Sequence, residues 1–160
     1  MKTMGFTELT LVKPGRLAGP EHEMARKMAV KSLDVLERAE RAESLARALA
    51  GIDYVFSTSS HRGISGVLLP RDAALRAVEL AAQNRRIAIV LGNEKTGLEA
   101  ADFELGHAVI RIPMVADQPS INLAQAVQLL AYELFLAALA AKGVEGSRGR
   151  GVEGGPEGEI

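Results

Sequence analysis

The sequence has no cysteine and no tryptophan, and its three histidines are far apart. Without cysteine, the chain can form neither a disulfide framework nor a thiolate metal site. His22, His61 and His107 show no H-x-x-x-H spacing, so we predict that the protein binds no metal. The chain also has no signal peptide and no uninterrupted apolar run of about 18 residues, which predicts a soluble cytoplasmic protein with no membrane partner.

The sequence also has almost no net charge. The chain carries 19 basic and 20 acidic residues, which gives a net charge of −1. Composition therefore gives no support for nucleic-acid binding, and any contact with RNA must come from a local patch. A hydrophobic content of 48% in 160 residues is typical of one globular domain with a substantial core.

The C-terminal segment lacks apolar periodicity. After Lys142 the sequence reads GVEGSRGRGVEGGPEGEI, which is dense in glycine and glutamate. Such a segment cannot bury enough apolar surface to offset the conformational entropy lost on ordering. We therefore predict a folded domain over residues 1–141 and a disordered tail over residues 142–160.

Segments with strand and helix patterns alternate along the rest of the chain. The alternation predicts an α/β fold, with a parallel sheet flanked by helices. We expect strands at Thr7–Lys13, Asp53–Thr58, Ile87–Leu91 and Ala108–Ile112, and helices at Pro20–Ala29, Ser32–Arg38, Ser44–Ala50, Arg71–Asn84, Leu98–Leu105 and Leu123–Ala140.

Three of these segments carry more specific expectations. The apolar run Ile87–Leu91 is typical of a strand buried on both faces. In the helix Arg71–Asn84, we expect Leu75, Val78 and Leu80 on the inner side. Met1–Gly5 resembles the last turn of a helix that is closed by a glycine.

Small and turn-forming residues follow the last two predicted strands. Loops that leave the carboxyl ends of parallel strands usually build the ligand site, so we expect a pocket there, lined largely by backbone. The segment Gly92–Gly97 has the glycine spacing of a P-loop, but Leu98 stands where that motif requires lysine. Glu94 would also repel a polyphosphate. Alternatively, the two glycines only supply permissive backbone angles in a turn.

The segments LGNEKTGL, IPM and PSINLAQAVQLLAYEL occur in this order, and together they resemble the signature of the SpoU/TrmH-type RNA methyltransferases of the SPOUT superfamily. MKTMGF, ARKMAV and FSTSSHRG resemble the TrmJ-like subgroup, so the resemblance runs from Met1 to about Leu139. It implies a C-terminal trefoil knot, a rare exception to the rule that chains do not thread through loops.

The resemblance also implies a cofactor, a reaction and a set of site residues. S-adenosylmethionine would bind in the knot to three loops, at Thr58, Ser59, Ser60, Leu91, Gly92, Ile112, Ser120, Ile121 and Leu123. Gly92 would allow the backbone to approach the ligand. A methyl group would pass to a ribose 2′-hydroxyl of tRNA or rRNA, with Glu94, Ser120 and Asn122 as catalytic residues. His61, Arg62 and Lys95 would contact the RNA.

One expected catalytic residue is missing from this sequence. The family uses an arginine in an N-x-x-A-x-x-R motif, which the TrmJ-like pattern places just upstream of Met1. Either the natural protein begins upstream, or the chain is a truncated, non-catalytic relic. Because the loss of a positioned proton acceptor slows a reaction by about 10²–10⁴, we expect cofactor binding with weak or absent methyl transfer.

Two further interpretations remain open at this stage. The chain could be a dimeric RNA- or nucleotide-binding module that keeps the cofactor pocket without turnover. It could also be a nucleotide-binding α/β domain unrelated to methyl transfer, although the failed phosphate-binding motifs weaken this reading. The sequence does not specify which RNA, or which nucleotide in it, is the substrate.

The predicted helix Leu123–Ala140 is apolar on more than one face. One stripe consists of Leu123, Val127, Leu130, Leu134 and Ala138, whereas Leu129, Phe135, Leu136 and Leu139 lie off it. Such a helix needs a second partner beyond its own sheet. It is either a fully buried core helix or part of a homodimer interface, and we predict the homodimer.

Overall fold

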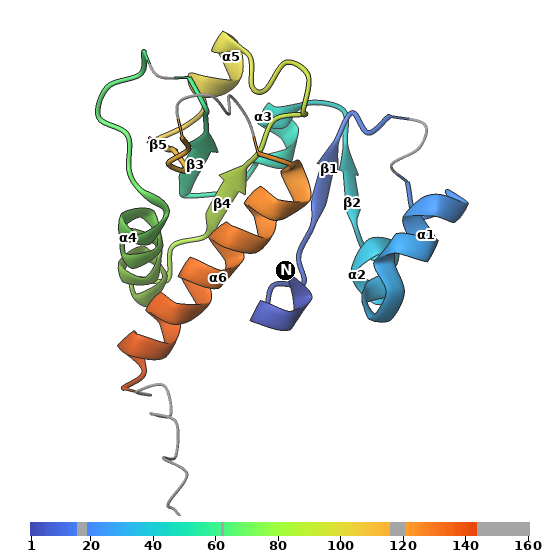
Figure 1. Ribbon diagram of the computed structural model, residues 1–160, viewed down its shortest axis with the longest axis horizontal. Coiled ribbons are helices and arrows are strands. Elements are labelled where there is room, and N and C mark those ends of the chain that lie inside the picture. Colours follow the sequence, from blue (N-terminus) through green and yellow to red (C-terminus); the bar gives the residue numbers. More distant parts are fainter. Residues whose placement is uncertain (16–18, 62, 116–120, 144–160) are drawn as a thin grey trace, which may run out of the picture.

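The computed structural model describes residues 1–15, 19–61, 63–115 and 121–143 (Figure 1). Within these ranges, five strands form two parallel sheets. Strands β3 (Tyr54–Thr58), β4 (Ile87–Val90) and β5 (Ala108–Ile110) make a sheet of order β4-β3-β5, and β1 (Thr10–Val12) pairs with β2 (Glu40–Ala42). The predicted α/β class with parallel strands is therefore confirmed.

Strand β3 lies at the centre of the three-stranded sheet. Phe56 stands opposite Ile89 of β4 on one side and Ala108 of β5 on the other. The carboxyl ends of the strands share one edge because all three run in the same direction. The Ser59 amide continues the ladder past that edge by donating to the Ile110 carbonyl at 3.0 Å. Three chain segments consequently leave the sheet side by side.

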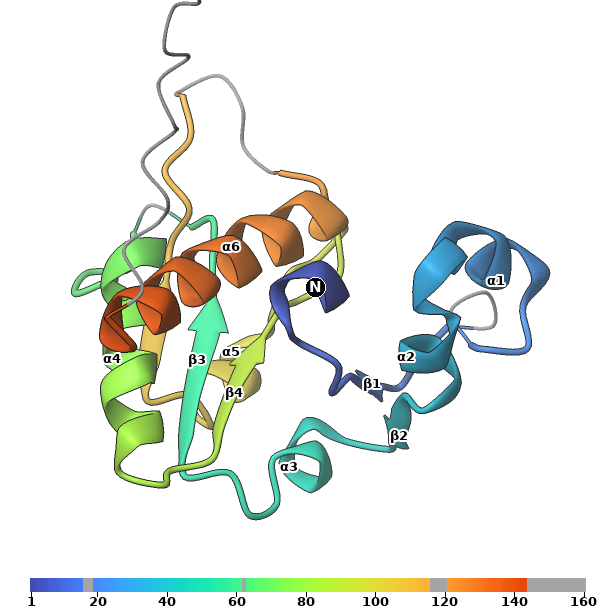
Figure 2. The same cartoon turned by 90° about the horizontal axis from the view of Figure 1, so that it is seen from below.

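Helices α4 (Pro70–Ala82) and α6 (Leu123–Ala141) pack against each other and cover this sheet (Figure 2). The core between these helices and the sheet is built from buried apolar side chains: Phe56, Ala73, Ala77, Leu80, Ile110 and Leu130. Proline begins α4 at a position where its missing amide hydrogen costs nothing. Asn122 caps α6 by accepting from the amides of Ala124 and Gln125.

The remaining helices are short. They are η1 (Lys2–Met4), α1 (Glu23–Ala29), η2 (Val30–Ser32), α2 (Leu33–Glu37), α3 (Leu45–Ala48) and α5 (Ala100–Phe103). Lys2 links η1 to α2, because its Nζ donates to Asp34 Oδ1 at 2.6 Å, and this bond lowers the pKa of that carboxyl. On its other side η1 packs against α6. As predicted, Gly5 closes the turn with a φ of 84°.

Some expectations from the sequence are wrong. Leu75 is 49% exposed instead of facing inward, and alanines together with Leu80 form the inner face of α4. Small side chains there let α4 pack closely against α6. Strand β4 is half-buried at every position rather than buried on both faces, since it lies at the edge of its sheet. Strand β2 was not predicted, because its residues Glu40–Ala42 show no strand pattern.

Helix α6 is, within the described ranges, long and apolar enough to cross a membrane by length and composition. Its mean hydropathy is 1.6 over a window of which 22% is buried. Gln125, Gln128 and Glu133 interrupt the apolar sequence, and one side of the helix packs onto the core through Leu130. Little of α6 is buried because the second side of the helix, which includes Tyr132 and Leu136, is exposed in the described part of the chain.

Two predictions concern segments beyond the described residues. The predicted knot involves the connection between β5 and α6, of which residues 116–120 lie outside the description. The predicted tail lies outside it from residue 144 onward, whereas Lys142 ends α6 and donates its amide to the Ala138 carbonyl at 3.2 Å. The division into a domain over 1–141 and a tail over 142–160 stays a prediction.

Candidate functional site

A cavity of about 650 Å³ lies at the carboxyl edge of the three-stranded sheet. Its volume is within the range of about 300–1,000 Å³ that is usual for small-molecule sites. Every predicted cofactor residue that the structure describes lines it: Thr58, Ser59, Ser60, Leu91, Gly92, Ile112, Ile121 and Leu123. Ser120 lies outside the described residues. The structure thus brings together residues from three separate loops, and their role in cofactor binding stays a prediction.

The first wall follows β3. Thr58 Oγ1 donates to the Val90 carbonyl at 3.0 Å, which ties the ends of β3 and β4 together. Ser59 Oγ accepts from the His61 amide at 3.0 Å and tightens the turn that begins there. Both bonds fix this wall of the cavity through polar groups of its own chain. His61 lines the cavity and is exposed, its contact with RNA stays a prediction, and Arg62 lies outside the described residues.

Asn93 organises the second wall, and the sequence analysis did not identify it. Its Oδ1 accepts from the amides of Lys95 at 2.9 Å and Thr96 at 3.0 Å, and its Nδ2 donates to Thr96 Oγ1 at 2.8 Å. The Gly97 amide then donates to the Asn93 carbonyl at 2.9 Å. Asparagine commonly bonds to the backbone two residues ahead in this way, so its position after Gly92 was an available signal.

The structure shows a reason for glycine at position 92 that lies within the chain itself. A Cβ atom at this position would lie 2.1 Å from the Gly97 carbonyl carbon and 2.4 Å from the Leu98 nitrogen. The missing side chain therefore makes room for the loop to fold back over Gly92, whereas the approach of a ligand to Gly92 stays a prediction. Gly97, with φ at 70°, supplies the left-handed angle that the same loop needs.

Apolar side chains form much of the third wall and the floor. The sequence analysis had not assigned several of these residues to the site: Leu98, Phe103, Ile110, Met114 and Ala126. Met114 ends the IPM segment, so this motif could have indicated that Met114 lines the cavity. Phe103 and Ala126 reach the cavity from α5 and α6, which no local pattern reveals. An apolar floor under a polar rim suits a ligand with a flat apolar part and polar substituents.

The predicted catalytic residues occupy different positions in the site. Glu94 and Lys95 line the cavity and are exposed at its rim. Asn122 is not among the lining residues. Its Oδ1 accepts from the amides of Ala124 at 3.0 Å and Gln125 at 3.3 Å, so the side chain has a structural task as the cap of α6.

Comparison with known proteins identifies the class of protein. The chain matches the SpoU rRNA Methylase family over residues 1–132, so it belongs to this family. The fold agrees with this assignment. A probable methyltransferase from Bordetella pertussis Tohama I is 40% identical and superposes with a TM-score of 0.78, over 86% of this chain and 84% of that one.

Several similar proteins are tRNA methyltransferases named TrmJ. The tRNA (cytidine/uridine-2′-O-)-methyltransferase TrmJ of Photorhabdus laumondii is 39% identical over 143 residues, which are 88% of this chain and 57% of that protein. TrmJ from Z. mobilis ZM4 is 32% identical with a TM-score of 0.75, over 85% of this chain and 60% of that one. The chain thus spans little more than half the length of the curated relatives that it matches.

Proposed function

We propose that this chain is a methyltransferase domain that transfers a methyl group from S-adenosylmethionine to a ribose 2′-hydroxyl of tRNA. The observation that carries the proposal is the cavity. It is lined by residues from three loops that the sequence predicts to bind the cofactor. The similarity to tRNA 2′-O-methyltransferases favours tRNA over rRNA as the substrate. It also favours an enzyme over the alternative of a non-catalytic binding module.

The cavity residues fit this cofactor. Leu91, Ile112 and Leu123 offer apolar surface for a purine ring, and the hydroxyl groups of Ser59 and Ser60 lie at the polar side. When bound, S-adenosylmethionine supplies an electrophilic methyl group on a sulfonium centre. The carboxylate of Glu94 at the rim adds a negative charge near a ligand that carries this positive sulfur.

The remaining task of the protein is to prepare the ribose. A 2′-hydroxyl is a weak nucleophile, so it must be oriented toward the methyl group and relieved of its proton. Among the described cavity residues, the carboxylate of Glu94 and the imidazole of His61 are the groups of the kind that act as general bases. Lys95 is placed beside Glu94 in the loop that Asn93 fixes, where its charge can hold an RNA phosphate.

Further parts of the proposal rest on the family. They include the trefoil knot, a catalytic contribution of Ser120, RNA contacts of His61 and Arg62, and a cytoplasmic location alongside tRNA. Each stays a prediction for this chain.

The proposal is tested with the full chain in excess over bulk tRNA, with rRNA in parallel, and with tritium-labelled S-adenosylmethionine. Excess protein allows even a slow single turnover to be seen. We expect label in 2′-O-methylated nucleosides of tRNA, above a sample without protein. A complete absence of transfer to either RNA, with cofactor binding retained, would contradict methyl transfer by this chain and favour the non-catalytic binding module.

Two variants separate the roles of Asn122 in the same assay. Serine caps helices as well as asparagine does, so Asn122→Ser should leave the thermal midpoint unchanged, whereas Asn122→Ala should cost about 0.5–2 kcal/mol of stability. If the amide also holds the ribose, both variants should transfer about 10²-fold more slowly. Wild-type transfer by Asn122→Ser would restrict Asn122 to capping.

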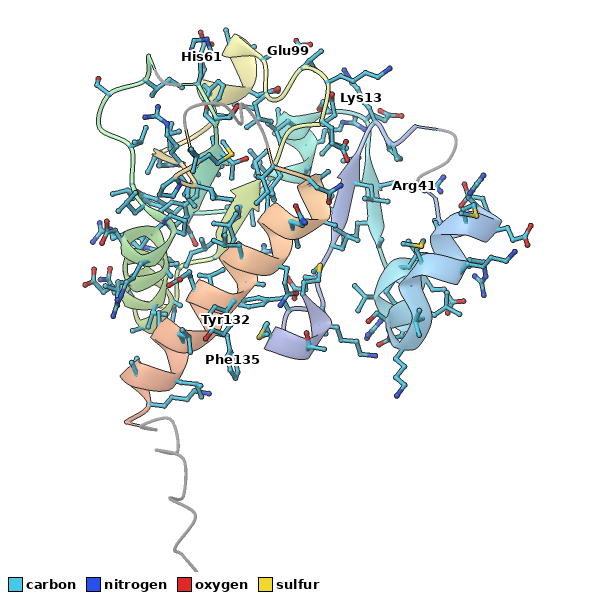
Figure 3. All side chains as sticks on the ribbon, viewed as in Figure 1. Lys13, Arg41, His61, Glu99, Tyr132 and Phe135 are labelled. Atoms are coloured by element: carbon cyan, nitrogen blue, oxygen red, sulfur yellow. The ribbon has the colours of Figure 1, made fainter. Side chains whose placement is uncertain are left out.

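We also propose a homodimer built on the open side of α6. Tyr132 is 47% and Leu136 40% exposed, and Leu129, Phe135 and Leu139 are only partly buried. Figure 3 shows Tyr132 and Phe135 on the side of α6 that is turned away from α4. A continuous apolar face of this kind marks an interaction surface.

Light scattering should therefore report twice the chain mass of 17.0 kDa at micromolar concentration. Leu136→Asp should shift the protein toward the monomer, because it would bury a charge in the interface. Leu75→Asp provides the matched control, since Leu75 is 49% exposed on α4. A wild-type mass of 17.0 kDa would contradict the dimer.

A further inference from the structure

Arg111 connects the end of β5 to the first wall of the cavity. Its Nη2 donates to the carbonyl oxygens of both His61 and Ile64, the latter at 2.9 Å. The two carbonyls are separated by 50 and 47 positions from Arg111 in the sequence. A single nitrogen thus holds His61 and Ile64, which together with Gly63 between them line the cavity.

The segment has little else to hold it. Its described residues, His61, Gly63 and Ile64, belong to no helix or strand, and His61 is exposed. Its described internal bonds include the short turn at Ser59 and a long contact of 3.5 Å from the Gly63 amide to His61 Nδ1. Hydrogen bonds from a charged donor are stronger than those between neutral groups, so Arg111 provides the strongest anchor seen in the described part of this loop.

The anchor also fixes which groups face the ligand site. Arg111 itself does not line the cavity, whereas Ser60, His61, Gly63 and Ile64 do. The carbonyl oxygens of His61 and Ile64 are directed toward the guanidinium and are thereby satisfied within the protein. A wall whose conformation is set before binding spares the ligand the entropy cost of ordering it.

We infer that Arg111 is a positioning residue for cofactor binding: it holds the cavity wall formed by residues 59–61, 63 and 64 in its binding conformation without touching the ligand. The inference rests on the proposed function insofar as the ligand is S-adenosylmethionine or its product. Arg111 fixes the first wall of the cavity, which neither the glycine-rich loop nor the apolar floor contacts in this way.

The test compares the affinity of the full chain for S-adenosylhomocysteine across three variants, by calorimetry. Arg111→Met removes both contacts while keeping much of the side-chain volume, and Arg111→Lys keeps the charge and one flexible donor group. Arg76→Met is the matched control, because Arg76 is an arginine on α4 whose partner is Glu79 at 3.4 Å and which does not line the cavity.

We expect the dissociation constant to rise about tenfold in Arg111→Met, because two hydrogen bonds from a charged donor are lost and part of this loss falls on folding. Arg111→Lys should recover part of the affinity, and Arg76→Met should bind like the wild type. Amide hydrogen exchange of the ligand-free proteins should accelerate over residues 59–64 in Arg111→Met, while β3 stays protected.

Wild-type affinity in Arg111→Met would overturn the inference. So would a general loss of protection across β3 and β5 that lysine does not correct, because Arg111 would then serve only stability. A wild-type chain that binds no S-adenosylhomocysteine would instead overturn the proposed function. The exchange measurement on the ligand-free proteins would still decide whether Arg111 orders the wall.

Discussion

Gly92→Val should abolish binding of S-adenosylhomocysteine while the core of the domain stays folded. The Cβ atom alone would lie 2.1 Å from the Gly97 carbonyl carbon, and valine adds two methyl groups to it. The obstacle is backbone, which cannot turn aside as a flexible side chain can. The loop over residues 93–97 must therefore move, and with it the second wall of the cavity and the positions of Glu94 and Lys95.

Calorimetry measures the loss of binding, and circular dichroism checks the fold. Gly63→Ala provides the control, because Gly63 also lines the cavity but an added Cβ would come no closer than 3.6 Å to a neighbouring atom. We expect the control to bind nearly as well as the wild type. If Gly92→Val bound with unchanged affinity, the loop over residues 92–97 would not belong to the ligand site.

Among the variants considered, Phe56→Ala should lower the free energy of unfolding the most. Phe56 is completely buried at the centre of β3, where it contacts Tyr54 with ring centroids 4.9 Å apart and packs between α4 and α6. Removing a buried aromatic ring leaves a cavity and typically costs about 3–5 kcal/mol. Because domains are stable by only about 5–15 kcal/mol, much of the total would be lost.

Urea denaturation at a fixed protein concentration measures this change, since dimerisation would make the midpoint depend on concentration. Leu75→Ala is the matched control, because that side chain is 49% exposed on α4 and its truncation should matter little. A loss below about 1 kcal/mol in Phe56→Ala would mean that the core repacks around the vacancy, contrary to the rigid packing expected of a sheet covered by two helices.

The class of fold and the position of the cavity could be predicted from the sequence alone. The alternation of strand and helix patterns indicates a parallel α/β sheet, and strands β3, β4 and β5 lie where apolar runs predict them. These signals are local, because a run of β-branched residues or a proline before a helix acts on its own neighbourhood. The glycine-rich and IPM segments marked two walls of the cavity for the same reason.

Which of these segments meet in space depends on the tertiary packing of the whole chain. It placed Phe103 and Ala126 in the cavity, exposed Leu75, and gave Gly92 its actual neighbours at Gly97 and Leu98. It also joined Arg111 to a loop 50 positions earlier in the chain. Parallel strands meet only through long connections, so contacts between their ends depend on how the whole chain packs and leave no periodic pattern in the sequence.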